Sequence, residues 1–242
     1  MIVCLDSGNS RIKWGVHDGV QWLAQGAVAH DNVGQLARLP VEWPHPAKVV
    51  LANVAGPEAA KRIRDQLARW LPVIRDVTSE FRRCGVTNRY RHPEQLGVDR
   101  WCALVGARGM SNASTIVVMA GTATTIDTLS AEGEFLGGVI LPGLELMRRS
   151  LARETAALPV ANGVYAAYPQ CTDDAIVSGA IEAQVGAIER AFARLADDGA
   201  CCMLSGGNAE LIGHYLVIPH HVAHNLPLEG LKRLALEQES EK

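Results

Sequence analysis

An α/β fold made of two similar halves is predicted by two glycine turns and by the strand-like segments that flank each turn. The first turn, at Gly8, lies within residues 2–16, and the second, at Gly121, lies within residues 116–129. Each segment begins with a short apolar, β-branched run, breaks at the glycine beside small hydroxyl or amide residues, and resumes as a strand. This pattern indicates a β-hairpin whose tight turn exposes N–H groups, as in a phosphate cradle. Its repetition predicts a duplicated fold with a nucleotide clamped between its halves.

The composition is that of an ordinary globular protein, with 242 residues, 48% hydrophobic and 20% charged. A net charge of -3 argues against a general nucleic-acid-binding surface. No apolar run approaches the length of a membrane span, and no basic leader precedes Ile2, which predicts no membrane segment, no signal peptide and a cytoplasmic location. The six cysteines form no C-x-x-C pair and are expected to be mostly buried, reduced thiols.

The first half is assigned to residues 1–114. After its hairpin it should contain strands at 24–29 and 48–54, a helix at 57–70, a strand at 71–77 and a helix at 99–109. The stretch between residues 79 and 99 is rich in arginine and poor in aliphatic residues, so we expect a functional loop there rather than core.

The second half is assigned to residues 115–242. After its hairpin it should contain a strand at 135–141, a helix at 144–151, a long helix at 173–195, a strand at 201–204 and a helix at 228–239. Thr172 is the expected N-cap of the long helix. No low-complexity linker separates the halves, which predicts that they pack together.

Asp6, at the end of the first strand, is a candidate magnesium ligand. A carboxylate repels phosphate, but it can hold Mg²⁺ directly or through water, and the metal then bridges phosphate oxygens. Lys13 is a candidate point charge for the same phosphates. Taken alone, an aspartate beside a glycine turn is more often explained by ordinary turn chemistry. The second turn favours the phosphate interpretation, and neither a P-loop nor a Rossmann fingerprint competes with it.

Asp99 and its neighbours allow two interpretations. In the first, Asp99 is the N-cap of the following helix. In the second, it is a general base toward a substrate hydroxyl, and Arg100 offers a guanidinium fork to a carboxylate or carbonyl. The Gly206-Gly207 turn is similarly open: it is either an ordinary strand-to-helix turn or a cap over an adenosine.

Taken in order, these motifs resemble the type III pantothenate kinases, a family of the acetate and sugar kinase/heat-shock ATPase/actin superfamily. The resemblance covers nearly the whole chain, and the ordered set is far more specific than any single motif. The matching residues are Asp6–Ser10 with Lys13, Tyr90, Gly97–Arg100, Gly121–Thr125, Gly137 and Gly138 with Pro142 and Gly143, Thr155–Pro159, Thr172 with Ala175, Ile176 and Gly179, Ser205–Gly207, and Leu228–Leu231.

The resemblance implies duplicated ribonuclease H-like (actin-like ATPase) domains with ATP in the cleft between them, working as a homodimer. It implies ATP-dependent phosphorylation of pantothenate, the first step of coenzyme A biosynthesis, with Asp99 as the base and Asp6 at Mg²⁺. The residues implied to bind the nucleotide are Asp6, Ser7, Gly8, Asn9, Ser10, Arg11, Ile12, Lys13, Gly121, Thr122, Gly206 and Gly207. Those implied to bind pantothenate are Tyr90, Gly97, Val98, Asp99, Arg100 and Thr172.

One position departs from the family pattern. Relatives commonly place an aspartate for a monovalent cation, K⁺ or NH₄⁺, two residues before the second Gly-Thr, and here that position is Met119. Because a thioether is a poor ligand for potassium, the requirement for such a cation is in question. This change is also the one feature that favours the alternative function, a non-catalytic regulatory or transcription accessory protein with the same fold. Asp99 and both turns favour the enzyme.

Overall fold

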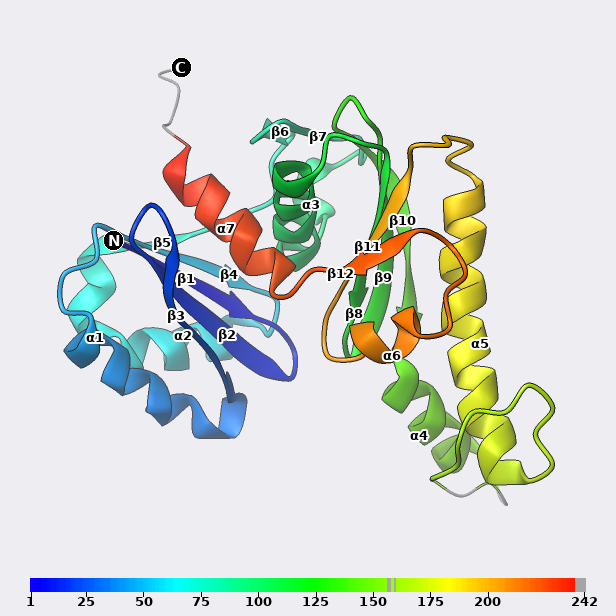
Figure 1. The fold of residues 1–242 in the computed structure, drawn as a ribbon. Coiled ribbons are helices and arrows are strands. Elements are labelled where there is room, and N and C mark those ends of the chain that lie inside the picture. The colour runs from blue at the N-terminus through cyan, green and yellow to red at the C-terminus, as the bar shows by residue number, and fades with distance from the viewer. Residues whose placement is uncertain (156–157, 159, 238–242) are drawn as a thin grey trace. The chain divides into compact units, whose positions relative to one another are not determined.

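The computed structural model describes residues 1–155, 158 and 160–237. Ala156, Ala157 and Pro159 of the Thr155–Pro159 motif therefore lie outside the described residues. The chain forms two compact units, drawn in Figure 1: unit 1 contains residues 1–112, 133–135 and the chain from 225 onward, and unit 2 contains residues 113–132 and 136–224. The sequence-based division at residue 114 put the last segment in the second half, whereas the structure packs it with unit 1.

The sheet of unit 1 begins with the first predicted hairpin. Its strands are β1 Ile2–Ser7, β2 Arg11–His17, β3 Trp22–Ala29, β4 Lys48–Asn53 and β5 Ile74–Asp76. They lie in the order β3-β2-β1-β4-β5, with β1 antiparallel to β2 and parallel to β4. A further short hairpin, β6 Arg82–Arg83 and β7 Val86–Asn88, occupies the stretch that was expected to be a loop, and its turn contains Gly85 at φ +76°.

The two faces of this sheet are covered by different helices. The helical segments of unit 1 are η1 His30–Arg38, α1 Leu39–Glu42, α2 Pro57–Gln66, η2 Ala68–Val73, η3 Pro93–Gln95, α3 Val98–Met110 and α7 Leu226–Leu236. Val3 and Leu5 of β1 join the apolar core beneath η1, α1, α2 and η2. Because side chains alternate along a strand, Cys4 and Asp6 point to the opposite face, against which α7 packs.

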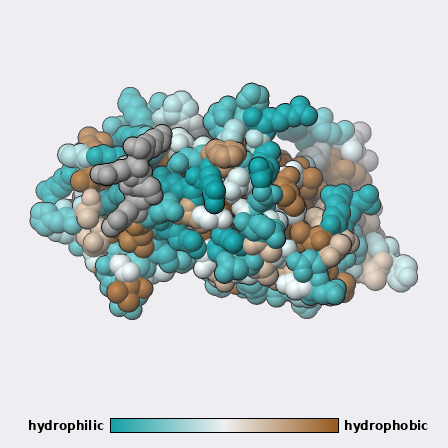
Figure 2. Space-filling view, turned by 90° about the horizontal axis from the view of Figure 1, so that it is seen from above, coloured by the Kyte–Doolittle hydropathy of each residue, from teal (hydrophilic) through white to brown (hydrophobic). Residues whose placement is uncertain are grey.

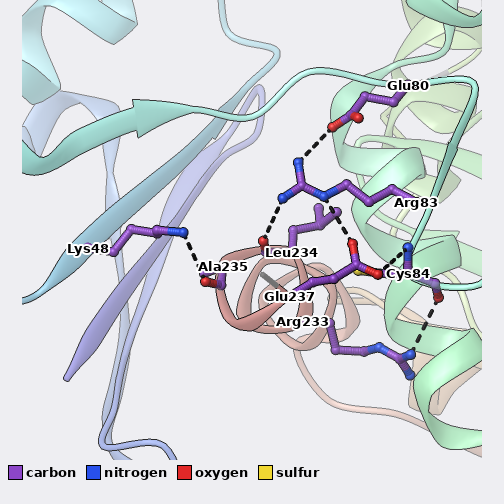
Figure 3. Close-up of polar contacts among 8 residues, drawn as sticks. All are labelled: Lys48, Glu80, Arg83, Cys84, Arg233, Leu234, Ala235 and Glu237. Atoms are coloured by element: carbon purple, nitrogen blue, oxygen red, sulfur yellow. Dashed lines mark hydrogen bonds and ion pairs between the residues drawn. The ribbon is translucent and has the colours of Figure 1, made fainter. Parts of the chain in front are cut away.

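Helix α7 is attached to unit 1 along its length. Glycines allow its backbone to approach that of α3, because a Cβ at Gly230 would overlap the carbonyl of Cys102. At its C-terminal end, Arg83 donates to Leu234 O at 3.2 Å and Lys48 donates to Ala235 O at 3.1 Å, as Figure 3 shows. These distant side chains satisfy carbonyls that a helix end leaves without intrahelical partners. They explain why the end of the chain belongs to unit 1.

The sheet of unit 2 repeats the plan of unit 1. Its strands are β8 Thr115–Ala120, β9 Ala123–Leu129, β10 Glu134–Pro142, β11 Cys201–Ser205 and β12 His220–Val222. They lie in the order β12-β11-β8-β9-β10, with β8 antiparallel to β9 and parallel to β11, and β7 and β6 extend the same sheet beyond β10. Counted from the hairpin, the five strands of each unit have the order third, second, first, fourth, fifth. The predicted duplication is therefore confirmed.

The helices of unit 2 are α4 Leu144–Glu154, α5 Thr172–Ala193 and α6 Ala209–Gly213. Side chains of α5 and α6 pack against β8 and β11 in the apolar core of this unit. In the part of the chain that the structure describes, no helix is both long and apolar enough to cross a bilayer. On the face seen in Figure 2, hydrophilic residues predominate and hydrophobic residues form separate groups.

Several predicted boundaries were wrong for local reasons. The helix expected at 57–70 ends at Gln66, and the strand expected at 71–77 is reduced to β5, because the 3₁₀ helix η2 with Pro72 lies between them. The last helix covers Leu226–Leu236 instead of 228–239: Pro227 fits its first turn, and Glu237 is already extended. Residues 238 and 239 lie outside the described residues.

Candidate active site

The first turn joins β1 to β2 in unit 1. Asp6 and Lys13 are register partners across the hairpin, and the Gly8 N–H donates to Arg11 O at 3.1 Å to close the turn. A Cβ at Gly8 would meet only Arg11 O, at an ordinary 3.6 Å. Packing within the chain therefore does not require a glycine here, and the space beside Gly8 is open. It leaves room for a ligand to approach the backbone, as a phosphate cradle requires.

Asp6 is a buried carboxylate with unsatisfied hydrogen-bonding capacity. Its Oδ1 atom and the Oγ atom of Ser7 are both buried and have no hydrogen-bond partner in the described part of the chain. Burial raises the pKa of Asp6 to about 6, the charge of Lys13 opposes this rise, and the charge of Asp99 adds to it. A buried carboxylate oxygen without a partner needs an explanation, and a hard cation supplies one.

The surroundings of Asp6 suit Mg²⁺, which needs few protein ligands, better than a metal ion that takes all its ligands from protein. Among the described residues, no three His, Cys, Asp or Glu side chains are grouped to hold a metal ion. Mg²⁺ commonly uses one or two carboxylates and takes its other ligands from water and phosphates. Asp6 at the end of β1, beside the exposed turn residues Asn9 and Ser10, is suited to that arrangement.

The segment Gly97–Arg100 forms the N-terminus of α3. Gly97 is the N-cap, so the interpretation of Asp99 as the N-cap is wrong. The Oδ1 atom of Asp99 accepts a hydrogen bond from the backbone N–H of Arg100 at 2.9 Å, and the side chain is half-buried. A Cβ at Gly97 would lie 2.7 Å from this oxygen, so only glycine at position 97 allows the carboxylate to occupy this position.

Arg100 is buried between aromatic residues. Its Nη1 donates to the hydroxyl of Tyr90 at 3.0 Å, and its guanidinium carbon lies 5.7 Å from the Tyr90 ring centre and 5.8 Å from that of Phe135. The structure thus brings Tyr90 into contact with Arg100, the residue that follows Asp99 in the chain. Phe135 was missed in the sequence, because it comes from the first residues of β10, which pair with β7 in unit 1.

The second turn joins β8 to β9 in unit 2 and is supported by two glycines. A Cβ at Gly143 would overlap Gly121 O and lie 2.6 Å from Thr122 O, and the Gly143 N–H donates to Thr122 O at 2.9 Å. Gly206 has φ +104°, and a Cβ there would overlap the carbonyl of Ala120. The structure therefore brings Gly121, Thr122 and Gly206 together, although they are far apart in the sequence.

A mainly apolar cavity of about 120 Å³ lies in the same unit. Its lining residues come from α4, α5 and the start of α6: Leu144, Glu145, Arg148, Val177, Ala180, Ile181, Asn208 and Leu211. Asn208 directly follows the Gly206-Gly207 turn, and its N–H donates to Ala120 O at 3.1 Å. No sequence motif indicated this cavity, since helical periodicity alone assigns such apolar residues to the core.

Two other candidates are Thr172 and Met119. Thr172 belongs to unit 2, whereas Tyr90, Asp99 and Arg100 belong to unit 1. Thr172 is also not the N-cap of α5: Cys171 holds that position and makes no side-chain capping bond, and Thr172 is an exposed first residue. Met119 is half-buried on β8 and pairs with Thr125 across the second hairpin.

The sequence model of the type III pantothenate kinase family matches residues 2–194. The type III pantothenate kinase of Dechloromonas aromatica (strain RCB) is 69% identical over 237 residues, which cover 98% of this chain and all of that protein. Two solved structures show the fold. One, from Campylobacter jejuni, is provisionally described as a Baf family transcriptional activator, with TM-score 0.64, 20% identity and 96% of both chains covered.

The other solved structure is a provisionally assigned 2-dehydro-3-deoxygalactonokinase of Sinorhizobium meliloti, with TM-score 0.62 and 17% identity over 97% of this chain and 98% of that one. At such identities the likeness shows the fold alone, and that fold is the duplicated ribonuclease H-like, actin-like ATPase fold expected from the sequence. The family model and the 69% identity over nearly the full length show family membership in addition to the fold. This chain belongs to the type III pantothenate kinase family.

Proposed function

We propose that this chain transfers the γ-phosphoryl group of ATP to the hydroxyl group of pantothenate, giving 4'-phosphopantothenate, the first step of coenzyme A biosynthesis. The observation that carries the proposal is the pair of carboxylates in unit 1. Asp6 is buried at the phosphate turn, Asp99 is half-exposed at the start of α3, and their charges interact. Membership of the kinase family supports the same chemistry.

Asp99 is the proposed general base. As pantothenate attacks the γ-phosphorus, a new oxygen–phosphorus bond forms, the bond to the β-phosphate oxygen breaks, and the hydroxyl proton passes to a carboxylate oxygen of Asp99. The partial exposure of Asp99 leaves it accessible to a substrate. Its Oδ1 atom is held by the hydrogen bond from Arg100 N, which fixes the position of the carboxylate that would accept the proton.

The residues Asp6 to Lys13 are proposed to hold the phosphates. Phosphoryl transfer needs positioning and charge neutralisation more than covalent chemistry from the protein. The exposed turn residue Asn9 offers a backbone N–H group, and Lys13 offers a positive charge beside Asp6. Mg²⁺ held at Asp6 would neutralise charge on the phosphate oxygens.

The second turn and the neighbouring cavity are proposed to serve the rest of the nucleotide. Gly121, Thr122, Gly206 and Gly207 are the turn residues of this unit, and Thr122 is exposed. The cavity next to Asn208 has mainly apolar walls with two charged side chains, Glu145 and Arg148, which suits a flat, partly polar base.

Arg100 and Tyr90 are proposed to bind pantothenate, with Gly97, Val98 and Thr172. Pantothenate carries a carboxylate, and a guanidinium group that is buried and fixed by a neighbouring phenol is a suitable partner for one. Thr172 requires its own test, because it lies in the other unit.

We also propose a homodimer working in the cytoplasm. Leu136, Val139 and Ile140 of β10 are 55%, 45% and 63% exposed. Exposed apolar residues on one strand favour a protein partner, and a second copy of this chain is the partner that the family implies. The free thiols of the six cysteines suit a reducing compartment.

An assay of ADP release with and without pantothenate tests the proposed function, with the product identified by its mass. The proposal expects release to depend on pantothenate and the product to gain one phosphoryl group. Absent release would favour the alternative, a non-catalytic accessory protein, whereas release that does not depend on pantothenate would indicate phosphoryl transfer to water or to another acceptor. The transcriptional-activator description of the Campylobacter jejuni structure does not support that alternative, because 20% identity shows the fold alone.

A further inference from the structure

We propose that His30 is a positioning residue of the nucleotide site, which orients the first phosphate turn by a hydrogen bond to the carbonyl oxygen of Gly8. The inference rests on the proposed function, since it assigns to His30 a part in binding the phosphates of ATP. His30 lies 22 residues after Gly8 and belongs to no motif that indicated the site. Sequence spacing therefore gave no reason to connect the two residues.

The contact itself defines which atom donates. The Nε2 atom of His30 lies 2.7 Å from Gly8 O. A carbonyl oxygen only accepts hydrogen bonds, so Nε2 must bear the proton in this arrangement. The imidazole ring is half-buried at the first residue of η1, directly after β3. The hydrogen bond thus connects the half-buried ring to the turn.

The backbone of His30 is held as well. Its carbonyl oxygen accepts a hydrogen bond from Nη2 of Arg62, on α2, at 2.5 Å. Arg62 is itself half-buried. The histidine is therefore linked to α2, which packs on the face of the sheet that bears Val3 and Leu5, and the link passes from α2 through His30 to the turn.

The geometry of a peptide bond explains what this contact does. The peptide between Gly8 and Asn9 is planar and trans, so the Gly8 C=O and the Asn9 N–H point in opposite directions. Because His30 holds the carbonyl oxygen, it directs the Asn9 N–H away from the imidazole ring. Asn9 is an exposed residue, and its N–H is the donor that this contact would orient for a phosphate.

Neighbouring bonds fix the rest of the turn. The Val54 N–H donates to Ser7 O at 3.0 Å, and the Gly8 N–H donates to Arg11 O at 3.1 Å. The Gly8 carbonyl is the next polar group along the chain, and His30 is its side-chain partner. A preorganised N–H binds an anion without first losing conformational freedom, so loss of the His30 contact should weaken binding of phosphate groups.

Two substitutions separate hydrogen bonding from packing. His30→Leu fills a similar volume but cannot donate, whereas His30→Gln places an amide donor at a similar reach. The probes are equilibrium binding of MgADP and the KM values for ATP and pantothenate. We expect His30→Leu to raise the dissociation constant of MgADP and the KM for ATP by about 5- to 30-fold, the effect of losing one hydrogen bond of about 1–2 kcal/mol. His30→Gln should recover most of this loss, and the KM for pantothenate should stay near its wild-type value.

The other outcomes overturn either the role of His30 or the proposed function. Unchanged MgADP binding in a folded His30→Leu variant overturns the role of His30, even when pantothenate is phosphorylated. Equal losses in both variants overturn it too, because they indicate packing instead of a donor. A wild-type protein that does not phosphorylate pantothenate overturns the proposed function, and MgADP binding still decides the role of His30. Should His30→Leu fail to fold, the ¹⁵N spectrum of the wild-type imidazole decides: a proton on Nδ1 with none on Nε2 contradicts the inference.

Discussion

Gly97 leaves room for the carboxylate of Asp99: a Cβ at position 97 would lie 2.7 Å from Asp99 Oδ1. Real Cβ atoms do not approach an oxygen so closely, so a side chain at 97 would displace the carboxylate. The conflict involves the end of a side chain, not the backbone of a neighbouring element. Gly97 therefore controls the position of the proposed base with little influence on the fold.

Gly97→Ala should lower kcat by about 10- to 100-fold, because displacing a catalytic group by about 1 Å can reduce the rate by up to about 100-fold. The temperature of unfolding should change little. Gly186→Ala is the matched control, since a Cβ there meets no atom within 4 Å on α5. A Gly97→Ala enzyme with wild-type kcat would show that Asp99 does not need its present position.

Asp6→Asn should stabilise the ligand-free protein at neutral and higher pH. Burial raises the pKa of Asp6 to about 6, so the folded state binds its proton more tightly than the unfolded state. The free energy of unfolding of the wild type then falls as the pH rises from about 4 to about 6 and stays lower above that window. A shift of about two pKa units corresponds to roughly 3 kcal/mol.

Urea unfolding of wild type and Asp6→Asn at several pH values measures this difference. The variant should be the more stable protein at pH 8 by on the order of 2–3 kcal/mol, and the two should converge near pH 4. MgATP should raise the unfolding temperature of the wild type more than that of the variant. A variant less stable than the wild type at pH 8 contradicts the account of Asp6 as a strained, buried carboxylate.

Gly143→Ala should disturb the second turn, because its Cβ would overlap Gly121 O and press on Thr122 O. Backbone atoms must move in this case, so we expect both a lower unfolding temperature and weaker nucleotide binding. Gly207→Ala is the control: a Cβ there meets no atom within 4 Å, and its unfolding temperature should stay near wild type. Equal MgADP affinity of wild type and Gly143→Ala would remove the second turn from the nucleotide site.

Met119 predicts activity with little dependence on potassium or ammonium. Its thioether is a poor ligand for such a cation, and charge near the phosphates then comes from Lys13, Mg²⁺ and backbone dipoles. Rates in sodium or Tris buffer should nearly equal those in potassium or ammonium. A strong rise on adding potassium would indicate a site built from main-chain carbonyls and the hydroxyls of Thr122 or Thr124. The Oγ1 atoms of Thr124 and Thr125 are buried and have no hydrogen-bond partner within the described residues, so this alternative has candidate ligands.

The sequence predicted the features that follow from local patterns. Both hairpins, the strand at Lys48–Asn53 and the long helix α5 were correct, because apolar periodicity and glycine turns specify them within a few residues. It did not predict η2, where Pro72 and tertiary packing replaced a strand. Nor did it show that α7 packs with the first unit, since helix packing depends on glycines far apart in the chain, such as Gly106 and Gly230.

The site shows the same division between local and distant contacts. Asp6, Lys13, Asp99 and Arg100 could be named from motifs, because turn and helix-start residues stand out from the apolar background. Phe135 and His30 could not, because long-range packing brings them to Arg100 and to Gly8, and no motif indicated the cavity beside Asn208.

The central claim is that Asp99 accepts the proton of the pantothenate hydroxyl, and the turnover of Asp99→Asn tests it most directly. Asparagine keeps the size of the side chain but cannot act as a base at neutral pH. We expect kcat for pantothenate phosphorylation to fall by about 10²- to 10⁴-fold, while MgADP binding and the unfolding temperature stay near wild type. An Asp99→Asn enzyme that keeps most of the wild-type kcat would contradict the claim.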